Sequence, residues 1–528
     1  MEVYESVVQP ALWRAQIPLN IQFSEEIHVG RGEVASRSEL VAQAGMWVIA
    51  GKLVARGIDL CSLLILTHLL SPADFGLIAL AMTTILIAEV VVELPLAQAM
   101  VRVSTLTEPV FATAFTLGML RGVFLASLMG VLAWPLSLLY QEPRLISLIC
   151  ALALAPILRG LVSPRMVIFM QKYDFRRDFL LDVIGKISAL VVATSIALGT
   201  GSYWAIAWGT ITTPLVAFIL SYIFAPLRPR LTLSQWSIFS DMVSWNTASQ
   251  LISALNWQMD KLLVGRLADW SSFGRYTVAD NLSGLPQQAL VQPLTRPLIA
   301  AFANITSPAA YPAAYCKATN AVFSATAPIL VCLAMLSEPF VRIVLGEKWL
   351  EAAPMLQWFA LSYLLSVPTE VLHPLAIAMN KTRFVALRMI SEFVVKLPAL
   401  VIGLALFGLN GALAARCVAT AAVFIAVAWI VRHLIGVTIK QQCKALWRPV
   451  SASAVMAIFL FLITPFVAAQ QTLLLMMLAT GASGLTAVAA YGATLLLLWT
   501  AAGRPDGVES MVVKKVQRML TSMPPKTA

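Results

Sequence analysis

Charged residues are scarce in this sequence. Only 12% of the 528 residues are Asp, Glu, Lys or Arg, whereas 59% are hydrophobic, and the mean hydropathy is +0.82. Soluble domains carry about 25% charged residues, so this composition excludes an ordinary soluble protein. The chain also lacks the alternating segments of about ten residues that are typical of transmembrane barrels.

Cysteine and histidine are too few and too scattered to define a site. None of the six cysteines falls in an expected outer segment, so we predict no disulfide. The four histidines show no metal-ligand spacing, and we predict neither a metal nor another cofactor. The first apolar run begins near Ala44, after a polar and partly acidic stretch, which is too late for a cleavable signal peptide.

Long apolar segments recur from end to end. They predict an all-α polytopic membrane protein with about fourteen transmembrane helices joined by short connections. We place these helices at 44–70, 75–100, 110–139, 144–170, 177–199, 203–225, 236–265, 272–302, 311–345, 350–379, 384–407, 411–434, 447–469 and 472–499.

The basic residues are unevenly distributed between the two sides of this arrangement. With the N-terminus inside, the inner connections hold most of them, whereas the outer connections hold little beyond Arg144, Arg266 and Lys348. This asymmetry predicts that both termini are cytoplasmic. It also explains the net charge of +11 without nucleic acid, because the basic residues punctuate apolar segments and do not form a continuous patch.

An internal repeat divides the chain. A shift of 198 residues places 40–82 on 238–280 without a gap, with eight identities in 43 positions that include Gly76 with Gly274. Both copies open a block of six expected helices in the same direction, which predicts two parallel lobes around a central cleft. The expected organisation is a cytoplasmic tail at 1–36, lobes at 37–230 and 231–440, two further helices at 441–502, and a basic cytoplasmic tail at 503–528.

Ionisable residues inside the expected helices carry the functional signal. The stretch GKLVARGIDLCSLLILTHLL (51–70) places Lys52, Arg56 and Asp59 on one helical face. Ten such cations facing lipid would cost roughly 25–35 kcal/mol, so most must face the protein interior, pair, or reach an interface. We expect Lys52 and Arg56 to line an aqueous cavity, with Asp59 neutralising Arg56 from one turn away.

The helix that opens the second copy carries a matching polar stripe. Asn246, Gln250, Trp257 and Asp260 follow one helical spacing. Polar stripes on both repeat-opening helices are typical of a wet lumen between lobes, and its excess positive charge suits a large anion.

Several charged residues have simpler interpretations. A spacing of four residues predicts ion pairs within single helices, Asp182 with Lys186 and Glu392 with Lys396. Arg121 and Arg296 lie near enough to helix ends to reach an interface.

Glu89 and Glu93 share a helical face with no cation in their own segment. They are either structural counter-ions of Lys52 or Arg56, or proton or cation coupling sites. The sequence leaves both open.

Three stretches resemble a known family. LLSPADFGLIALAMTTILIAEVVVELPLAQAMVR (69–102) is similar to the first hairpin of oligosaccharide flippases in the polysaccharide-transporter branch of the MOP superfamily. The segments 173–209 and 256–305 are similar to later parts of the same proteins. The Pro-x-Asp-Phe-Gly turn (72–76) and the Gln-x-Asp…Gly-Arg…Phe-Gly-x-Tyr run (258–276) are the most specific.

The resemblance implies two six-helix lobes and the movement of a polyprenyl-diphosphate-linked oligosaccharide from the inner to the outer leaflet of a bacterial plasma membrane. It implies a cationic central cavity, a role carried over to Lys52 and Arg56, and no catalytic residue. The implied partners are the lipid-linked oligosaccharide, membrane lipids, and a polysaccharide polymerase with other assembly proteins. Two alternatives remain: a multidrug or cation antiporter of the same superfamily, which Glu89 and Glu93 would favour, and a membrane polysaccharide polymerase.

Overall fold

The structure is a computed structural model that describes residues 31–103, 105–244, 247–470, 472–504 and 510. The expected N-terminal tail up to residue 30 and most of the expected C-terminal tail lie outside these residues. The first helix begins at Arg31, six residues before the expected start of the first lobe. No strand occurs in the described part of the chain, as the all-α prediction requires.

The first half of the chain forms a series of helical hairpins. Its helices are α1 (Arg31–Leu69), α2 (Pro72–Val91), α3 (Leu96–Arg102), α4 (Glu108–Tyr140), α5 (Arg144–Leu152), α6 (Leu154–Gly160), η1 (Pro164–Met166), α7 (Val167–Gln171), α8 (Arg176–Thr200) and α9 (Trp204–Phe224).

The second half continues in the same way. Its helices are α10 (Ser237–Ser244), α11 (Thr247–Leu267), α12 (Trp270–Pro286), η2 (Gln287–Val291), α13 (Gln292–Ala303), η3 (Pro308–Ala310), α14 (Tyr311–Met335), α15 (Ser337–Val344), η4 (Glu347–Ala352), α16 (Ala353–Ser366), η5 (Val367–Val371), α17 (Leu372–Ala378), α18 (Arg383–Ile435), α19 (Ile439–Ala468) and α20 (Leu473–Ala501).

The protein is a multi-pass membrane protein. Within the described residues, nine helices are long and apolar enough to cross a membrane, or ten if the bent pair Arg144–Gly160 and Pro164–Gln171 is one span. This number is lower than the expected fourteen, partly because α18 counts once. With 53 residues it would be roughly 80 Å long, far more than the roughly 30 Å of a bilayer core. Gly408, at φ 58° and ψ −140°, interrupts it, so α18 is two helices joined by a kink.

Prolines interrupt two further helices. The helix that starts at α12 changes to a π-helical turn, η2, directly after Pro286 and continues as α13. The helix that starts at α16 changes to the 3-10 turn η5, which contains Pro368, and continues as α17. Proline removes a backbone donor and crowds the preceding turn, which explains why the helix type changes at these positions.

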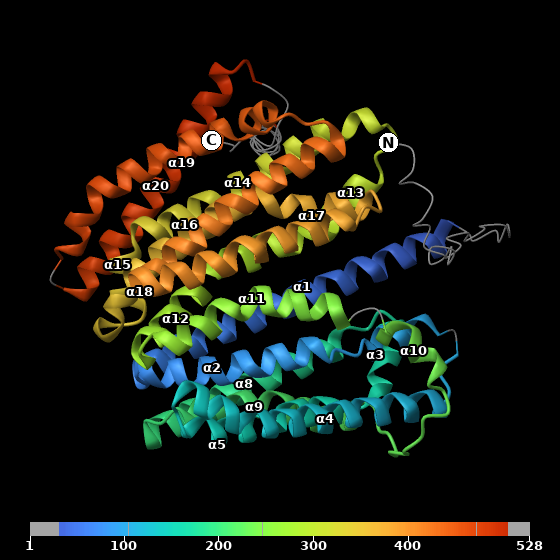
Figure 1. The fold of residues 1–528 in the computed structure, drawn as a ribbon. Helices are drawn as coiled ribbons and strands as arrows, with labels where there is room; N and C mark the ends of the chain where they lie inside the picture. The colour runs from blue at the N-terminus through green and yellow to red at the C-terminus, as the bar shows by residue number, and fades with distance from the viewer. Residues whose placement is uncertain (1–30, 104, 245–246, 471, 505–509, 511–528) are drawn as a thin grey trace, which may run out of the picture.

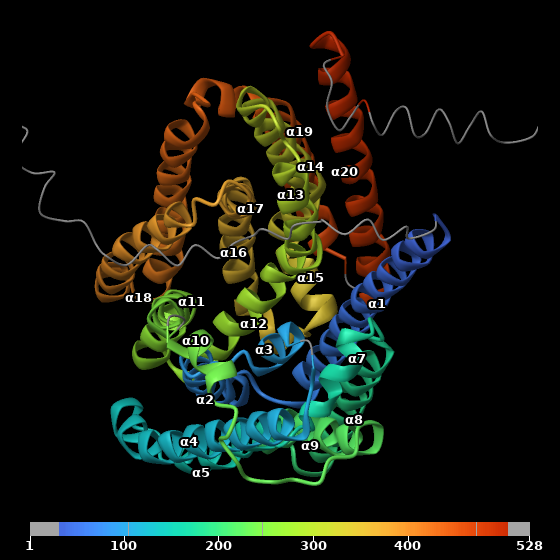
Figure 2. The ribbon, with the colours of Figure 1, turned by 90° about the vertical axis from the view of Figure 1, so that its right-hand side faces the viewer.

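The helices lie in two groups. Helices α2, α4, α5, α8 and α9 form one side of the molecule and α14 to α20 the other, with α11 and α12 between them (Figures 1 and 2). The largest cluster of buried apolar side chains takes residues from both groups, such as Leu77, Phe273, Trp349 and Phe359. The two halves therefore share one core along α2, α11 and α12.

The connection between the halves packs against the first half. Backbone N–H groups of Thr232 and Gln235 donate to the hydroxyls of Thr116 and Thr113 on α4, at 3.0 and 3.3 Å. Phe239 of α10 is buried among apolar side chains of α3 and α4. Residues 231–244, which we expected to open the second lobe, thus contact the first half.

Candidate functional site

The charged face of α1, formed by Lys52, Arg56 and Asp59, is open. Lys52 is exposed and makes no hydrogen bond or ion pair with any described residue. The side chain of Arg56 is 55% exposed, and its nearest carboxylate is that of Asp59, at 3.9 Å. The Asp59 carboxylate also lies 2.5 Å from the ammonium of Lys186 on α8. Because the shorter contact is with Lys186, Asp59 only partly neutralises Arg56.

Helical spacing predicted an ion pair between Asp182 and Lys186. This prediction is wrong, because Lys186 pairs with Asp59. Helix α1 packs along α8, with the ring of Trp47 against that of Phe179 at 5.3 Å, and this packing brings Asp59 to Lys186. No signal in the sequence of α8 alone identifies a partner on another helix.

Glu89 also has a different partner from those expected. Its carboxylate forms an ion pair with Arg159 of α6, not with Lys52 or Arg56. Arg121 of α4 donates to the backbone carbonyl oxygens of Glu89 and Val92, at 3.0 and 2.6 Å. These carbonyls belong to the last turn of α2, where helix carbonyls lack intrahelical partners. Arg121 therefore caps α2, and Glu93 follows directly after this end of α2.

The polar stripe of α11 divides into exposed and buried residues. Asn246 and the side chain of Gln250 lie outside the described part of the structure. Trp257 is 71% exposed near the middle of α11, whereas Asp260 is 1% exposed. The expectation that Asp260 faces an open cavity is therefore wrong. Of the two stripe residues whose side chains the structure describes, only Trp257 is exposed.

Asp260 belongs to a buried ionic cluster, here defined as Asp260, Lys261, Asp280, Lys396 and Arg416. The guanidinium of Arg416 on α18 lies at its centre. One terminal nitrogen is 2.9 Å from Asp260 Oδ2 and the other is 2.9 Å from Asp280 Oδ1. The guanidinium also lies over the ring of Phe359, at 4.7 Å. A single cation thus joins the carboxylates of α11 and α12.

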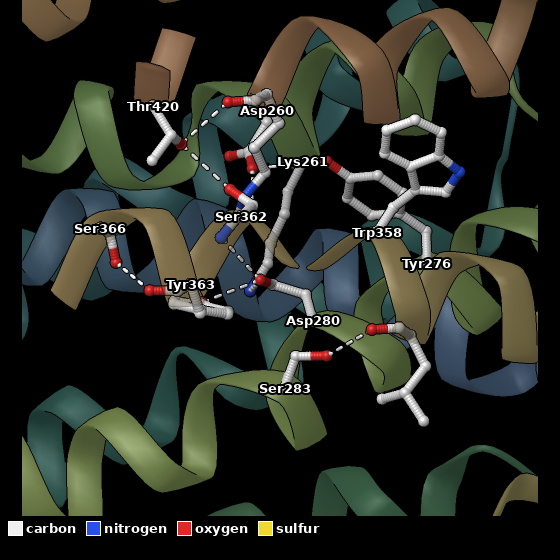
Figure 3. A network of polar contacts seen from close by, with 12 residues as sticks. Asp260, Lys261, Tyr276, Asp280, Ser283, Trp358, Ser362, Tyr363, Ser366 and Thr420 are labelled. Carbon is white, nitrogen blue, oxygen red and sulfur yellow. Dashed lines mark hydrogen bonds and ion pairs between the residues drawn. The ribbon is translucent and has the colours of Figure 1, made fainter. Parts of the chain in front are cut away.

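Lysines and tyrosines complete the ionic cluster. Lys396 Nζ donates to the carbonyl oxygen of Asn256 at 2.8 Å and lies 3.6 Å from Asp260 Oδ1. Lys261 Nζ lies 3.6 Å from Asp280 Oδ2, and the Tyr363 hydroxyl donates to Asp280 Oδ1 at 3.0 Å (Figure 3). The predicted ion pair of Glu392 with Lys396 is wrong, because the side chain of Lys396 points into the ionic cluster.

The ten cations inside the expected helices are Lys52, Arg56, Arg121, Arg159, Lys186, Lys261, Arg296, Arg388, Lys396 and Arg416, and seven of them have a partner closer than the 3.9 Å contact of Arg56 with Asp59. Arg388 pairs with Glu370 at 2.7 Å, and the others are Arg121, Arg159, Lys186, Lys261, Lys396 and Arg416. Lys52, Arg56 and Arg296 of α13 are exposed without a close partner, since Arg296 makes no ion pair with a described residue and Arg56 has only its 3.9 Å contact. Within the described chain, no group of three or more His, Cys, Asp or Glu side chains is placed to hold a metal ion. The site offers positive charge for binding.

The fold and these exposed cations define a polytopic helical membrane protein that keeps positive charge accessible within its helices. Comparisons with known proteins agree with that class. The chain belongs to the family described as Polysaccharide biosynthesis protein, whose profile matches residues 65–354, more than half of the sequence. This confirms the resemblance to the polysaccharide-transporter branch of the MOP superfamily.

Individual relatives are distant but cover most of the chain. Lipopolysaccharide biosynthesis protein WzxC of Escherichia coli (strain K12) is 22% identical over 424 residues, which span 78% of this chain and 85% of the relative. Succinoglycan biosynthesis transport protein ExoT of Rhizobium meliloti (strain 1021) is 22% identical over 464 residues, 86% and 92% of the two chains.

Solved structures share the fold. Lipid II flippase MurJ in an inward closed conformation matches with a TM-score of 0.66 at 15% identity, covering 85% of this chain and 99% of that one. An inward-facing multidrug resistance MATE family transporter of the MOP superfamily matches with a TM-score of 0.54 at 14% identity, covering 70% and 92%. The chain therefore has the helical fold that these MOP-superfamily transporters share.

Proposed function

We propose that this protein moves a polyprenyl-diphosphate-linked oligosaccharide from the inner to the outer leaflet of a bacterial inner membrane during the synthesis of a surface polysaccharide or exopolysaccharide. The names of the relatives support the pathway, since they include a lipopolysaccharide biosynthesis protein and a succinoglycan transport protein. The proposed partners are the lipid-linked oligosaccharide, membrane lipids, a polysaccharide polymerase and other proteins of the assembly complex.

The observation that carries the proposal is the difference between the cations. Cations within membrane helices are costly unless they pair or meet water, and most in this chain are paired. Lys52 and Arg56 share one helical face and stay exposed, the second with only a 3.9 Å contact to Asp59. We propose that they line a wet cavity between the lobes, together with Arg296 and Trp257.

The chemistry of the substrate fits such a cavity. A diphosphate and several sugars cannot cross hydrocarbon without replacing their hydration, and charge-assisted hydrogen bonds to Lys52 and Arg56 supply part of that replacement. With the cell interior negative, moving two negative charges outward gains about 4–5 kcal/mol at 100 mV. This gain in free energy is smaller if Lys52 and Arg56 move through the electric field of the membrane together with the substrate.

The proposed architecture is fourteen spans in two lobes of six plus two C-terminal helices, with alternating access by rocking of the lobes. The ends of the helices support the repeat. Helices α1 and α11 end at Leu69 and Leu267, and α2 and α12 begin at Pro72 and Trp270. Both pairs are 198 positions apart, the shift on which the sequence repeat rests.

The proposed orientation has both termini in the cytoplasm. Reporter fusions test it directly: fusions at Gly201 and Asn410 should report an outside position, and one at Lys381 an inside position. The reversed pattern would overturn the orientation but not the fold.

The antiporter alternative has less support than the sequence suggested. It relied on an acidic lumen formed by Glu89 and Glu93, but Glu89 forms an ion pair with Arg159 within the first half of the chain. The similarity to a MATE transporter concerns the fold alone and does not favour either substrate.

Export in cells tests the proposal. A strain that lacks its own lipid-linked oligosaccharide transporter should regain surface polysaccharide when it produces this chain, and lipid-linked repeat units should stop accumulating on the inner leaflet. Matched strains that produce an empty vector serve as the control. A chain that reaches the membrane, restores no polysaccharide and confers drug resistance would show that the antiporter alternative is correct.

A further inference from the structure

At one end of the molecule, the two halves meet backbone to backbone. The first turns of α2 and α12 cross with Gly76 and Gly274 at the contact. A Cβ atom on Gly76 would lie 2.2 Å from the carbonyl oxygen of Trp270, and one on Gly274 would lie 1.8 Å from that of Pro72. Backbone atoms cannot rotate out of the way as a flexible side chain can. The crossing in its present form therefore requires glycine at both positions.

This contact is reciprocal. Gly76 and Gly274 are 198 positions apart in the sequence, and so are their contact residues Pro72 and Trp270. The caps that start the two helices follow the same rule: the side chain of Ser71 accepts from the N–H of Asp74, and that of Asp269 accepts from the N–H of Ser272. Equivalent segments that make the same contact with each other lie on the axis that relates them.

A second contact closes the same end. The ammonium of Lys348 in η4 donates to the carbonyl oxygens of His68 and Leu70, at 2.8 and 2.6 Å. These carbonyls lie at the C-terminal end of α1, where helix carbonyls lack partners and a cation is favourable. One lysine of the second half thus caps a helix of the first half.

Trp349 adds an apolar seal beside this cap. Its ring is fully buried, its indole N–H donates to the carbonyl oxygen of Thr67 at 2.9 Å, and it packs edge-on against Phe75 at 5.2 Å. All of these contacts lie where α1 and α11 end and where α2 and α12 begin (Figure 1).

We propose that the Gly76–Gly274 crossing and the Lys348 cap form the outer gate of the transport path, closed in this structure. The inference rests on the proposed function, because alternating access requires a closed end to open. The glycines allow the tightest approach of the two helices, and a side chain at either position favours the state that is open at this end. The gate opens by separating two helices that are related by the repeat.

Labelling of a buried reporter cysteine tests the gate without a transport assay. Thr67 is fully buried, and its carbonyl oxygen accepts from the indole N–H of Trp349 beside the cap. Thr67→Cys would be introduced into the full-length chain after replacement of the six native cysteines, and its reaction with a membrane-impermeant maleimide measured in whole cells and in inside-out vesicles. In the closed state, the reporter should react slowly from both sides.

Adding Gly76→Ala or Gly274→Ala should raise the labelling rate by roughly 10- to 100-fold, the population change expected from overpacking a tight contact. Gly57→Ala and Gly199→Ala are matched controls, since an added Cβ atom at these helical positions meets nothing within 4 Å. They should leave the rate unchanged.

Lys348→Met tests the cap while it leaves the helix crossing intact. It should raise the rate by roughly 2- to 30-fold, as expected for loss of a cation at a helix C-terminus. Lys317→Met, at an exposed lysine of α14, is its control. If the glycine variants do not reach the membrane, Lys348→Met decides the question.

Unchanged labelling in Gly76→Ala, Gly274→Ala and Lys348→Met would overturn the gate. Failure of the proposed function has a different signature. In that case the unmutated chain would not restore polysaccharide export, yet the labelling rates would still respond to the gate substitutions.

Discussion

The charged face of α1 and the ionic cluster of α11, α12 and α18 both place cations inside membrane helices, but their surroundings differ. The side chain of Arg416 is only 15% exposed and shares its guanidinium between Asp260 and Asp280, at 2.9 Å from each. Arg56 is 55% exposed, and its nearest carboxylate is 3.9 Å away. Both residues looked alike as intramembrane arginines, so composition alone does not separate a structural charge from a binding charge.

The difference indicates what each group does. Removing one partner from a buried ion pair is strongly destabilising, because it leaves the other charge buried and uncompensated. Removing an exposed cation leaves nothing uncompensated in the protein and affects only what the cation binds. The cluster should therefore respond to substitution in stability, and the face of α1 in transport.

The largest expected effect is on stability, from Arg416→Met. This substitution leaves Asp260 and Asp280 without their shared cation and should cost about 3–5 kcal/mol, typical of a broken buried ion pair. This loss of stability would be measured as the amount of protein in the membrane and as the thermal midpoint of the purified protein in detergent. Arg296→Met, at an exposed arginine, is the control for stability and should keep the abundance and the thermal midpoint of the unmutated protein. A normal midpoint for Arg416→Met would mean that the cluster is not structural.

The next effect is on transport, from Arg56→Ala. Loss of a charge-assisted hydrogen bond to the substrate, worth roughly 1.5–3 kcal/mol, predicts about a 10- to 150-fold lower rate at subsaturating substrate. Polysaccharide export would be measured at equal membrane abundance of each variant. Arg56→Lys keeps the charge without the planar fork and should retain part of the activity.

Arg228→Ala is the matched control for Arg56→Ala, since Arg228 is an exposed arginine of the connection between the halves. Full export by Arg56→Ala at normal abundance would remove Arg56 from the mechanism. Reduced abundance with normal export per molecule would instead show a structural role.

A smaller effect is expected from Lys186→Met. The pair with Asp59 is partly exposed, so its loss should change stability by less than about 1 kcal/mol. Asp59 is then free to pair with Arg56, which should weaken substrate binding and lower export by roughly two- to fivefold. The double variant Lys186→Met with Asp59→Asn should restore export. If it stays as low as the single variant, Asp59 does not compete for Arg56.

The smallest stability effect is expected from Trp257→Ala. Because the side chain is 71% exposed, its removal should change stability by no more than about 0.5 kcal/mol. Trp349→Ala is the contrasting variant, since that ring is buried and bonded to Thr67. A large loss of stability from Trp257→Ala would show that Trp257 is packed and does not face the cavity.

The sequence alone predicted the class of protein and much of its local structure. Charge scarcity and long apolar segments require membrane helices, because only a helix satisfies its own backbone in lipid. The expected helices also left turns at 71–74 and 266–271, where Ser71 and Asp269 cap the helices that follow. The changes of helix type at Pro286 and Pro368 also have a local cause, since proline cannot donate a backbone hydrogen bond.

Only the tertiary structure decided which charges pair. Helical spacing predicted that Lys186 and Lys396 pair within their own helices, but they pair with Asp59 and Asp260 on α1 and α11. A pair at four-residue spacing is worth only about 0.2–0.5 kcal/mol, whereas burial of an unpaired charge costs several kcal/mol. Because the cost of burial exceeds the gain from helical spacing, each buried charge pairs with whichever opposite charge the packing brings to it. That packing depends on which helices are neighbours in space, and no local spacing encodes it.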